Sequence, residues 1–290
     1  RNIKKKTIVA IEGAYHGDTF GAMAVGDRSL FTAPFTDYLF DVQFIPFPTS
    51  NNEEEVINRF NALLNEHQVG AFIFEPLIQG AAGMRMYNPT ILNKLLKIAK
   101  HHEVICIADE VFSGFFRTGK FLASEYLEIQ PDIIALSKGL TGGTMPLGVT
   151  ACSQEIYNAY LSTEMTKAFL HGHSYTGNPL ACAVGNASFN LLFEDACQRN
   201  IKQIITSHTD FAKELESNKI KEIRQLGTIL AIEINTPENT GYTNTIRKKI
   251  YDYFLDQDIL LRPLGNVIYM VPPYIITAEE LQKIYKTIKE

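Results

Sequence analysis

Two apolar runs of the chain end in charged side chains: VICIADE at residues 104–110 and IIALSKG at residues 133–139. Each run has the length of a buried strand, and apolar residues at helical spacing occupy 89–102, just before the first run. Strands that are apolar throughout are typical of a sheet covered by helices on both faces. The stretch therefore predicts an α/β fold with a mostly parallel sheet.

The same alternation extends in both directions from this stretch. Further strands are expected at 7–11, 42–45, 71–74 and 148–152, and further helices at 53–66, 154–161, 179–193 and 200–215. Beyond the last of these helices the rhythm changes, with strands expected at 222–225, 229–234 and 267–270 and helices at 243–255 and 278–289. We therefore expect a large domain over 1–197 and a small α+β domain over 198–290.

Composition excludes several classes of protein. A net charge of −5 without a long basic block argues against nucleic-acid binding. No run of 18 apolar residues is present, so no membrane helix is expected. The four cysteines form no Cys-x-x-Cys pair, which argues against structural zinc. We expect them to be buried free thiols in a reducing cytoplasm.

The carboxyl ends of parallel strands are where open α/β sheets bind ligands. Asp109 and Glu110 follow the first apolar run, and Lys138 follows the second. From the strands alone, the acids could equally cap a helix or form a loop salt bridge, and the lysine could be an ordinary surface residue. The glycines of Thr141–Thr144 suggest a phosphate loop only weakly, because the Walker pattern is absent.

Two further stretches carry polar and aromatic groups. Tyr15, His16 and Asp18 crowd a glycine-flanked turn after the strand at 7–11, where either ring could stack on a flat ligand and where Asp18 could simply stabilise the turn. The segment HGHSYTGNP (171–179) opens a helix, and hydroxyls with free N–H groups there suit a phosphate. No further ligand is spaced with its two histidines, so no metal site is expected.

Taken together, these signals suit a pyridine aldehyde cofactor. A lysine can hold an aldehyde, an acid can pair with the pyridine nitrogen, and an aromatic ring can stack on the cofactor ring. Six segments then show that the sequence closely resembles the class III aminotransferases that use pyridoxal 5′-phosphate. These segments are AYHGDTFGAMAVG (14–26), EPLIQGAAGMRMY (75–87), ADEVFSGFFRTGKFLASE (108–125), PDIIALSKGLTGGTMPLG (131–148), HGHSYTGNPLACAVGNASF (171–189) and RPLGNVIYMVPPYIIT (262–277).

The resemblance implies a fold-type-I transferase and a role for each matching residue. Lys138 is the implied attachment point of the cofactor aldehyde and the catalytic residue, Asp109 the partner of the pyridine nitrogen, and Tyr15 and Val111 the groups on the two faces of the ring. Gly172 and Ser174 are implied to approach the cofactor phosphate from the neighbouring subunit of a homodimer. The implied substrate-binding set is Arg262, Tyr15, Tyr269, Arg117, Asp18 and Gly172, with Arg262 on the substrate carboxylate.

The first, fourth and last segments favour the subgroup of biotin biosynthesis, which converts the keto acid 8-amino-7-oxononanoate to 7,8-diaminononanoate. Its members typically take the amino group from S-adenosylmethionine, and some relatives use lysine. Many class III members carry glutamine where this chain has Phe112, which argues against a general ω-amino-acid transaminase. Another class III enzyme, such as an ω-transaminase or an aminomutase, stays an alternative.

Members of the family carry a further N-terminal part, with a glycine-serine loop for the phosphate and tryptophans of the substrate pocket. This chain has no tryptophan, and we expect it to be part of a longer protein. An inactive fragment that contributes only a dimer interface is therefore another alternative. The least favoured alternative is that GLTGGT (139–144) belongs to a nucleotide-binding module.

Overall fold

The computed structural model describes residues 5–27 and 31–290, which form two compact units. The first unit comprises Arg1–Leu77, Tyr87–Ser113 and Ser124–Asn190, and the second comprises Ile78–Met86, Gly114–Ala123 and Leu191–Glu290. The division therefore differs from a single cut after residue 197. Two short segments that lie within the first unit's sequence pack with the second unit.

The first unit is built on a six-stranded sheet with the order β2-β1-β3-β6-β7-β8. Its strands are β1 (Thr7–Ile11), β2 (Gln43–Ile45), β3 (Val69–Phe74), β6 (Ile105–Asp109), β7 (Ile133–Leu136) and β8 (Val149–Cys152). Every neighbouring pair is parallel except β7 and β8. The predicted α/β fold with a mostly parallel sheet is confirmed.

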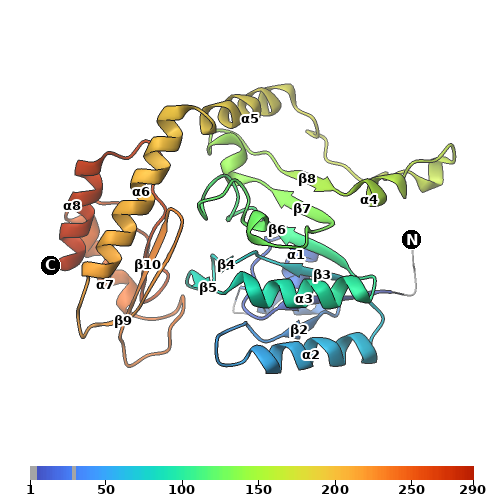
Figure 1. The fold of residues 1–290 in the computed structure, drawn as a ribbon, viewed down its shortest axis with the longest axis horizontal. Coiled ribbons are helices and arrows are strands. Elements are labelled where there is room, and N and C mark those ends of the chain that lie inside the picture. The colour runs from blue at the N-terminus through green and yellow to red at the C-terminus, as the bar shows by residue number, and fades with distance from the viewer. Residues whose placement is uncertain (1–4, 28–30) are drawn as a thin grey trace. The chain divides into compact units, whose positions relative to one another are not determined.

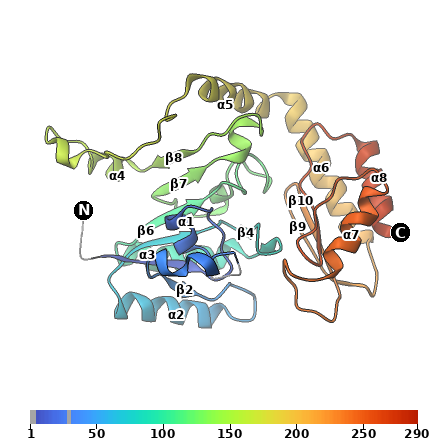
Figure 2. The same cartoon turned by 180° about the vertical axis from the view of Figure 1, so that it is seen from behind.

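Helices cover both faces of this sheet, with α3 on one face and α1 on the other (Figures 1 and 2). The helices are α1 (Phe20–Val25), α2 (Glu53–Glu66), α3 (Pro89–His101), α4 (Gln154–Asn158) and α5 (Pro179–Leu192), with short 3-10 turns at Ala33–Tyr38, Ala123–Tyr126, Lys138–Thr141 and Met165–Lys167. Helix α3 begins where Asn88 accepts a hydrogen bond from the Thr90 amide and proline occupies the first turn. Its buried Leu92, Leu95 and Leu96 lie on one face, which fixes the helix on the sheet.

The second unit is an antiparallel sheet of β9 (Ile220–Leu226), β10 (Ile229–Ile234) and β11 (Val267–Met270), with β10 in the middle. It also contains α6 (Asp195–Glu214), α7 (Ile246–Leu255), α8 (Ala278–Lys289) and the hairpin of β4 (Ile78–Gln79) and β5 (Arg85–Met86). Arg224 on β9 binds the carbonyl of Gly83 at 2.8 Å, which holds the hairpin's turn against this sheet.

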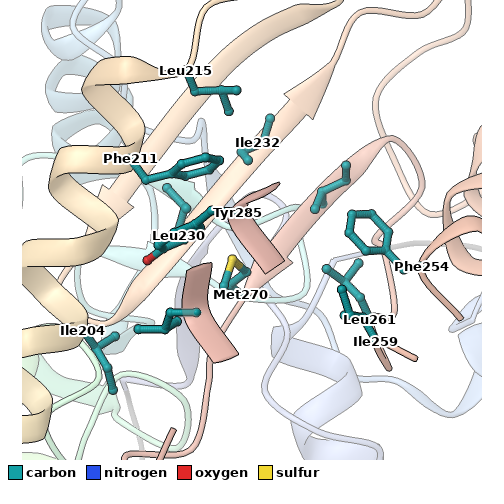
Figure 3. Close-up of a cluster of buried hydrophobic side chains, with 12 residues drawn as sticks. Ile204, Phe211, Leu215, Leu230, Ile232, Phe254, Ile259, Leu261, Met270 and Tyr285 are labelled. Atoms are coloured by element: carbon teal, nitrogen blue, oxygen red, sulfur yellow. The ribbon is translucent and has the colours of Figure 1, made fainter. Parts of the chain in front are cut away.

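The core of the second unit joins α6, α8 and β10 (Figure 3). Phe211 of α6 stacks on Tyr285 of α8 with 4.2 Å between ring centroids, and Leu230 of β10 is fully buried in the same cluster. Stacked rings and buried aliphatic groups remove apolar area from water, which is the main favourable contribution to folding.

The turn between β9 and β10 packs closely on the segment 114–123. Gly227 has a left-handed φ of +57°, and a Cβ atom placed there would lie 2.2 Å from the carbonyl carbon of Thr118. The Thr228 amide donates to the Arg117 carbonyl at 2.9 Å beside it. Only glycine permits this approach of the two backbones.

The expectation of four buried thiols is wrong for two of them. Cys106 is buried, Cys197 is partly buried, and Cys152 and Cys182 are exposed. Cys152 lies on β8, which is the sheet's edge strand, and Cys182 lies on α5, most of whose residues are exposed. An apolar run indicates a strand but does not show whether anything covers it. Among the described residues, no helix is long and apolar enough to cross a membrane.

His208 gives the second unit a pH-dependent stability. Its ring is fully buried on α6, with Nδ1 at 2.6 Å from the Tyr285 hydroxyl. Burial lowers the pKa of His208 to about 4 from 6.5. As pH falls from 6.5 to 4, the unfolded chain gains a proton that the folded chain excludes. The free energy of unfolding therefore falls with pH in this window, by about 3 kcal/mol for such a shift.

Urea unfolding of the chain at a series of pH values, followed by circular dichroism, measures this dependence. His208→Gln retains a hydrogen-bonding partner for Tyr285 and is expected to remove the extra loss of stability between pH 6.5 and 4. The exposed His101→Gln is the matched control and is expected to behave as the wild type. Equal pH profiles for the wild type and His208→Gln would contradict this account.

Candidate active site

The carboxyl edge of the parallel strands gathers the polar groups of the first unit. Asp109 is the last residue of β6 and pairs with Ala135 of β7. Lys138 follows Ala135 by three residues, so it comes shortly after the position that lies beside Asp109. Glu75 follows β3, and Tyr15 follows β1 on the next strand over. The aromatic residue, the acid and the lysine therefore follow strands whose carboxyl ends lie along one edge of this sheet.

Asp109 is held by two donors. Its Oδ2 lies 2.7 Å from His16 Nδ1, and its Oδ1 accepts a hydrogen bond from the Val111 amide at 3.1 Å. The aspartate is 8% exposed, so these partners replace much of its hydration. His16, which the sequence suggested as a stacking ring, instead binds the carboxylate, and its buried Nε2 has no partner among the described residues.

Tyr15 is placed by its backbone. Its amide donates to Glu75 Oε1 at 3.0 Å, and the Glu75 carbonyl accepts from the Tyr87 hydroxyl at 2.5 Å. Tyr15 is 46% exposed, so a flat ligand can reach this residue. Partial burial and a hydrogen bond with Asp18 raise the pKa of the Tyr15 phenol, so these two predicted site residues contact each other.

Lys138 is exposed at the start of a 3-10 turn, with a left-handed φ of +46°. Its Nζ lies 5.5 Å from the centroid of the Phe112 ring. A non-glycine residue in this region is strained, and such strain collects at functional sites. The glycines that follow turn the backbone, since Gly142 and Gly143 both have positive φ.

Glu110 has a structural task that the sequence did not reveal. The side chain is fully buried, and Oε2 accepts from the Ser113 hydroxyl at 2.6 Å. Oε1 accepts from both the amide and the hydroxyl of Ser124, each at 2.6 Å. The available signal was a second acid directly after an apolar strand. Its partner 14 residues further on could not be identified from spacing.

Gly172 and Ser174 lie in an exposed segment before α5. The expected anion site at the start of that helix is partly occupied by the chain itself. The side-chain oxygen Oδ1 of Asn178 accepts from the amides of Leu180 and Ala181, at 2.9 and 3.1 Å. The Thr176 hydroxyl likewise accepts from the His173 amide. An anion would therefore have to bind the Gly172–Ser174 stretch rather than the first turn of α5.

The predicted carboxylate site belongs to the second unit. Arg262 is exposed just before β11, and its charge acts on Tyr269, whose pKa is raised by burial and lowered in part by this arginine. No carboxylate among residues 5–27 and 31–290 forms an ion pair with Arg262. Its guanidinium fork can therefore accept an external carboxylate.

Arg117 is used differently. Its Nη1 donates to the Pro272 carbonyl at 2.6 Å, and the guanidinium lies 4.6 Å from the centroid of the Tyr274 ring. The Tyr274 hydroxyl in turn donates to the Phe115 carbonyl at 2.6 Å. All of these groups lie in the second unit, so Arg117 shapes the segment that follows β11.

The residues of the first unit fit a pyridoxal cofactor by their chemistry. The carboxylate of Asp109 suits a protonated ring nitrogen, the exposed amine of Lys138 suits an aldehyde, and the half-exposed ring of Tyr15 suits stacking. Among the described residues, no cluster of three or more histidine, cysteine or acidic side chains could hold a metal ion.

Known proteins share both the sequence and this fold. The aminotransferase class-III family matches residues 1–290. An adenosylmethionine-8-amino-7-oxononanoate aminotransferase of Synechococcus elongatus is 41% identical over 99% of this chain and 69% of its own length. One from Helicobacter pylori is 37% identical over 97% of the chain and 65% of its own length.

Solved structures agree with these matches. The adenosylmethionine-8-amino-7-oxononanoate aminotransferase of Methanocaldococcus jannaschii has a TM-score of 0.87 and 35% identity, covering 99% of this chain and 68% of that one. An omega transaminase from Pseudomonas jessenii has a TM-score of 0.86 at 23% identity, with 98% and 67% covered. This chain thus spans about two thirds of the length of its relatives. The strand ends, the sheet order and these matches together show that the chain belongs to the class-III aminotransferase family.

Proposed function

We propose that the protein is a pyridoxal-phosphate-dependent transaminase that aminates 8-amino-7-oxononanoate to 7,8-diaminononanoate. The observation that supports this most directly is the 41% identity to a relative named for that reaction. The amino donor in that name is S-adenosylmethionine, and we propose it as the donor here. Lysine is the alternative donor. The omega transaminases share the fold alone at 23% identity, so they do not favour the alternative substrates.

Each of the site residues of the first unit would have a separate role toward the cofactor. When bound, pyridoxal phosphate supplies an aldehyde for amines and a ring that accepts electrons. Lys138 Nζ would hold the cofactor and move a proton at the reacting carbon. Asp109, held by His16 and Val111, would keep a negative charge opposite the ring nitrogen. Tyr15 and Val111 would confine the ring from its two faces.

The second unit would supply groups that bind the substrate. We assign Arg262 to the keto-acid carboxylate, because its guanidinium is exposed and its planar fork matches a carboxylate. Tyr269 would line the pocket beside Arg262. Arg117 would shape that pocket through Pro272 and Tyr274 rather than bind the substrate directly. Asp18 would lie close to the amino donor through its contact with Tyr15.

A homodimer would complete the site. The stretch from β8 to α5 exposes large apolar side chains, with Met165 78% and Leu180 67% exposed. Exposed apolar surface of this extent is typical of an interface. The partner copy would cover it, and Gly172 and Ser174 would reach the cofactor phosphate of that copy. We place the enzyme in the cytoplasm, with small-molecule substrates and no nucleic-acid or membrane partner.

The donor can be tested by visible absorption of the full-length protein loaded with pyridoxal phosphate. Adding S-adenosylmethionine is expected to bleach the yellow band, because the donor passes its amino group to the bound cofactor. Lysine added to a matched sample is expected to leave the band in place. Bleaching by lysine alone would assign the donor differently, and no band in loaded protein would contradict the assignment of Lys138.

Lys138→Ala in the full-length protein is expected to lower kcat by several orders of magnitude, because it removes the amine that would hold the cofactor and carry the proton. Lys138→Arg keeps the charge and is expected to be equally inactive. The exposed Lys94→Ala is the matched control. Substantial turnover by Lys138→Arg, with an unshifted unfolding temperature, would refute the role of this lysine.

Arg262→Ala is expected to raise the KM for the keto acid by about tenfold to a hundredfold while kcat at saturation changes little. Arg262→Lys keeps a charge without the planar fork and should lie between the wild type and Arg262→Ala. The exposed Arg199→Ala serves as the control. Steady-state kinetics with varied keto acid make the measurement, and an unchanged KM would remove Arg262 from the carboxylate site.

A further inference from the structure

Glu110 holds together the two points where the chain passes between the units. The segment 114–123 belongs to the second unit, whereas Ser113 and Ser124 on either side of it belong to the first. Both serines bind the one carboxylate of Glu110, through three hydrogen bonds of 2.6 Å. The residues directly before and directly after this segment are therefore bound to one buried carboxylate.

The tied segment has an unusual backbone. Phe115 and Phe116 have φ of 59° and 69°, so two bulky residues in succession adopt the left-handed conformation. Such a conformation persists only where the surroundings enforce it. The Phe116 ring packs 5.6 Å from Phe121 and 5.5 Å from Phe193, and Tyr274 binds the Phe115 carbonyl. Glu110 binds the residues directly before and directly after this strained segment.

The same residue continues into the proposed cofactor site. The Glu110 amide donates to the Ala135 carbonyl at 3.0 Å, which extends the pairing of β6 with β7 beyond Asp109. The Val111 amide donates to Asp109 Oδ1. A movement of the Glu110 side chain would thus shift the peptides that orient Asp109 and Val111.

We propose that Glu110 is a positioning residue for the cofactor ring. Its buried carboxylate, by holding Ser113 and Ser124, keeps Asp109 and Val111 in the orientation that the ring requires. This inference rests on the proposed roles of Asp109 and Val111. It assigns Glu110 no contact with the cofactor or the substrate.

Glu110→Ala in the full-length protein tests the proposal. Its dissociation constant for pyridoxal phosphate, measured by equilibrium dialysis, is expected to rise about tenfold or more, the size of one or two lost hydrogen bonds to a charged group. The pH dependence of the cofactor's visible absorption should also shift, because Asp109 is displaced from the ring nitrogen. Glu110→Gln keeps an acceptor for the Ser124 amide and should recover part of both effects. The exposed Glu128→Gln is the control and should match the wild type.

Two further variants keep the test decisive. Ser124→Ala removes a single hydroxyl, so it should fold even if Glu110→Ala does not, and it should weaken cofactor binding severalfold. Combined with Glu110→Ala it should add little, because both changes remove the same contact. A Glu110→Ala or Ser124→Ala protein that unfolds at a lower temperature but keeps the wild-type dissociation constant and absorption profile would overturn the inference.

Asp109→Asn separates this inference from the function on which it rests. If Asp109→Asn alters the absorption profile and Glu110→Ala does not, the positioning role of Glu110 is overturned and the function stands. If Asp109→Asn itself leaves the profile and the cofactor affinity unchanged, the proposed role of Asp109 fails, and the role of Glu110 fails with it.

Discussion

Two carboxylates stand side by side at the buried end of β6, and each must find donors because little water reaches either of them. Asp109 takes His16 and the Val111 amide, while Glu110 takes Ser113 and Ser124. His16 comes from the turn after β1, whereas the Val111 amide, Ser113 and Ser124 come from the chain that follows β6. Satisfying these two charges draws together the turn after β1 and the segment after β6. The arrangement of the site follows from that requirement.

Much of the sheet could be predicted from sequence alone. The strands Thr7–Ile11 and Ile133–Leu136 begin and end where their apolar runs do. The six residues of α1 were too few to show a period, and the two-residue strands β4 and β5 carry no pattern. Helix α4 ends at Asn158, earlier than the apolar residues suggested. The two short segments that pack with the second unit could not be assigned to it from the sequence, because packing and not composition places them there.

The site was predictable to the extent that strand order determines it. An acid and a lysine after consecutive parallel strands meet at one edge, so the neighbourhood of Asp109 and Lys138 follows from the alternation of strands and helices. The direction in which His16 points, and the distant partner of Glu110, depend on side-chain rotamers and on a turn of irregular backbone. No spacing rule contains that information. The resemblance to a known family supplied the roles of Arg262 and Tyr269, which no strand pattern indicated.

The distribution of the thiols has a practical consequence. Burial raises the pKa of Cys106 to about 12, so this thiol is inert toward alkylating reagents in the folded chain. Cys152 and Cys182 are exposed on β8 and α5, the apolar surface described above. A maleimide dye would therefore label that surface without any engineered residue, and the partly buried Cys197, whose pKa is raised by burial, would react more slowly. The rate of labelling would report directly, in the native sequence, whether another polypeptide shields it.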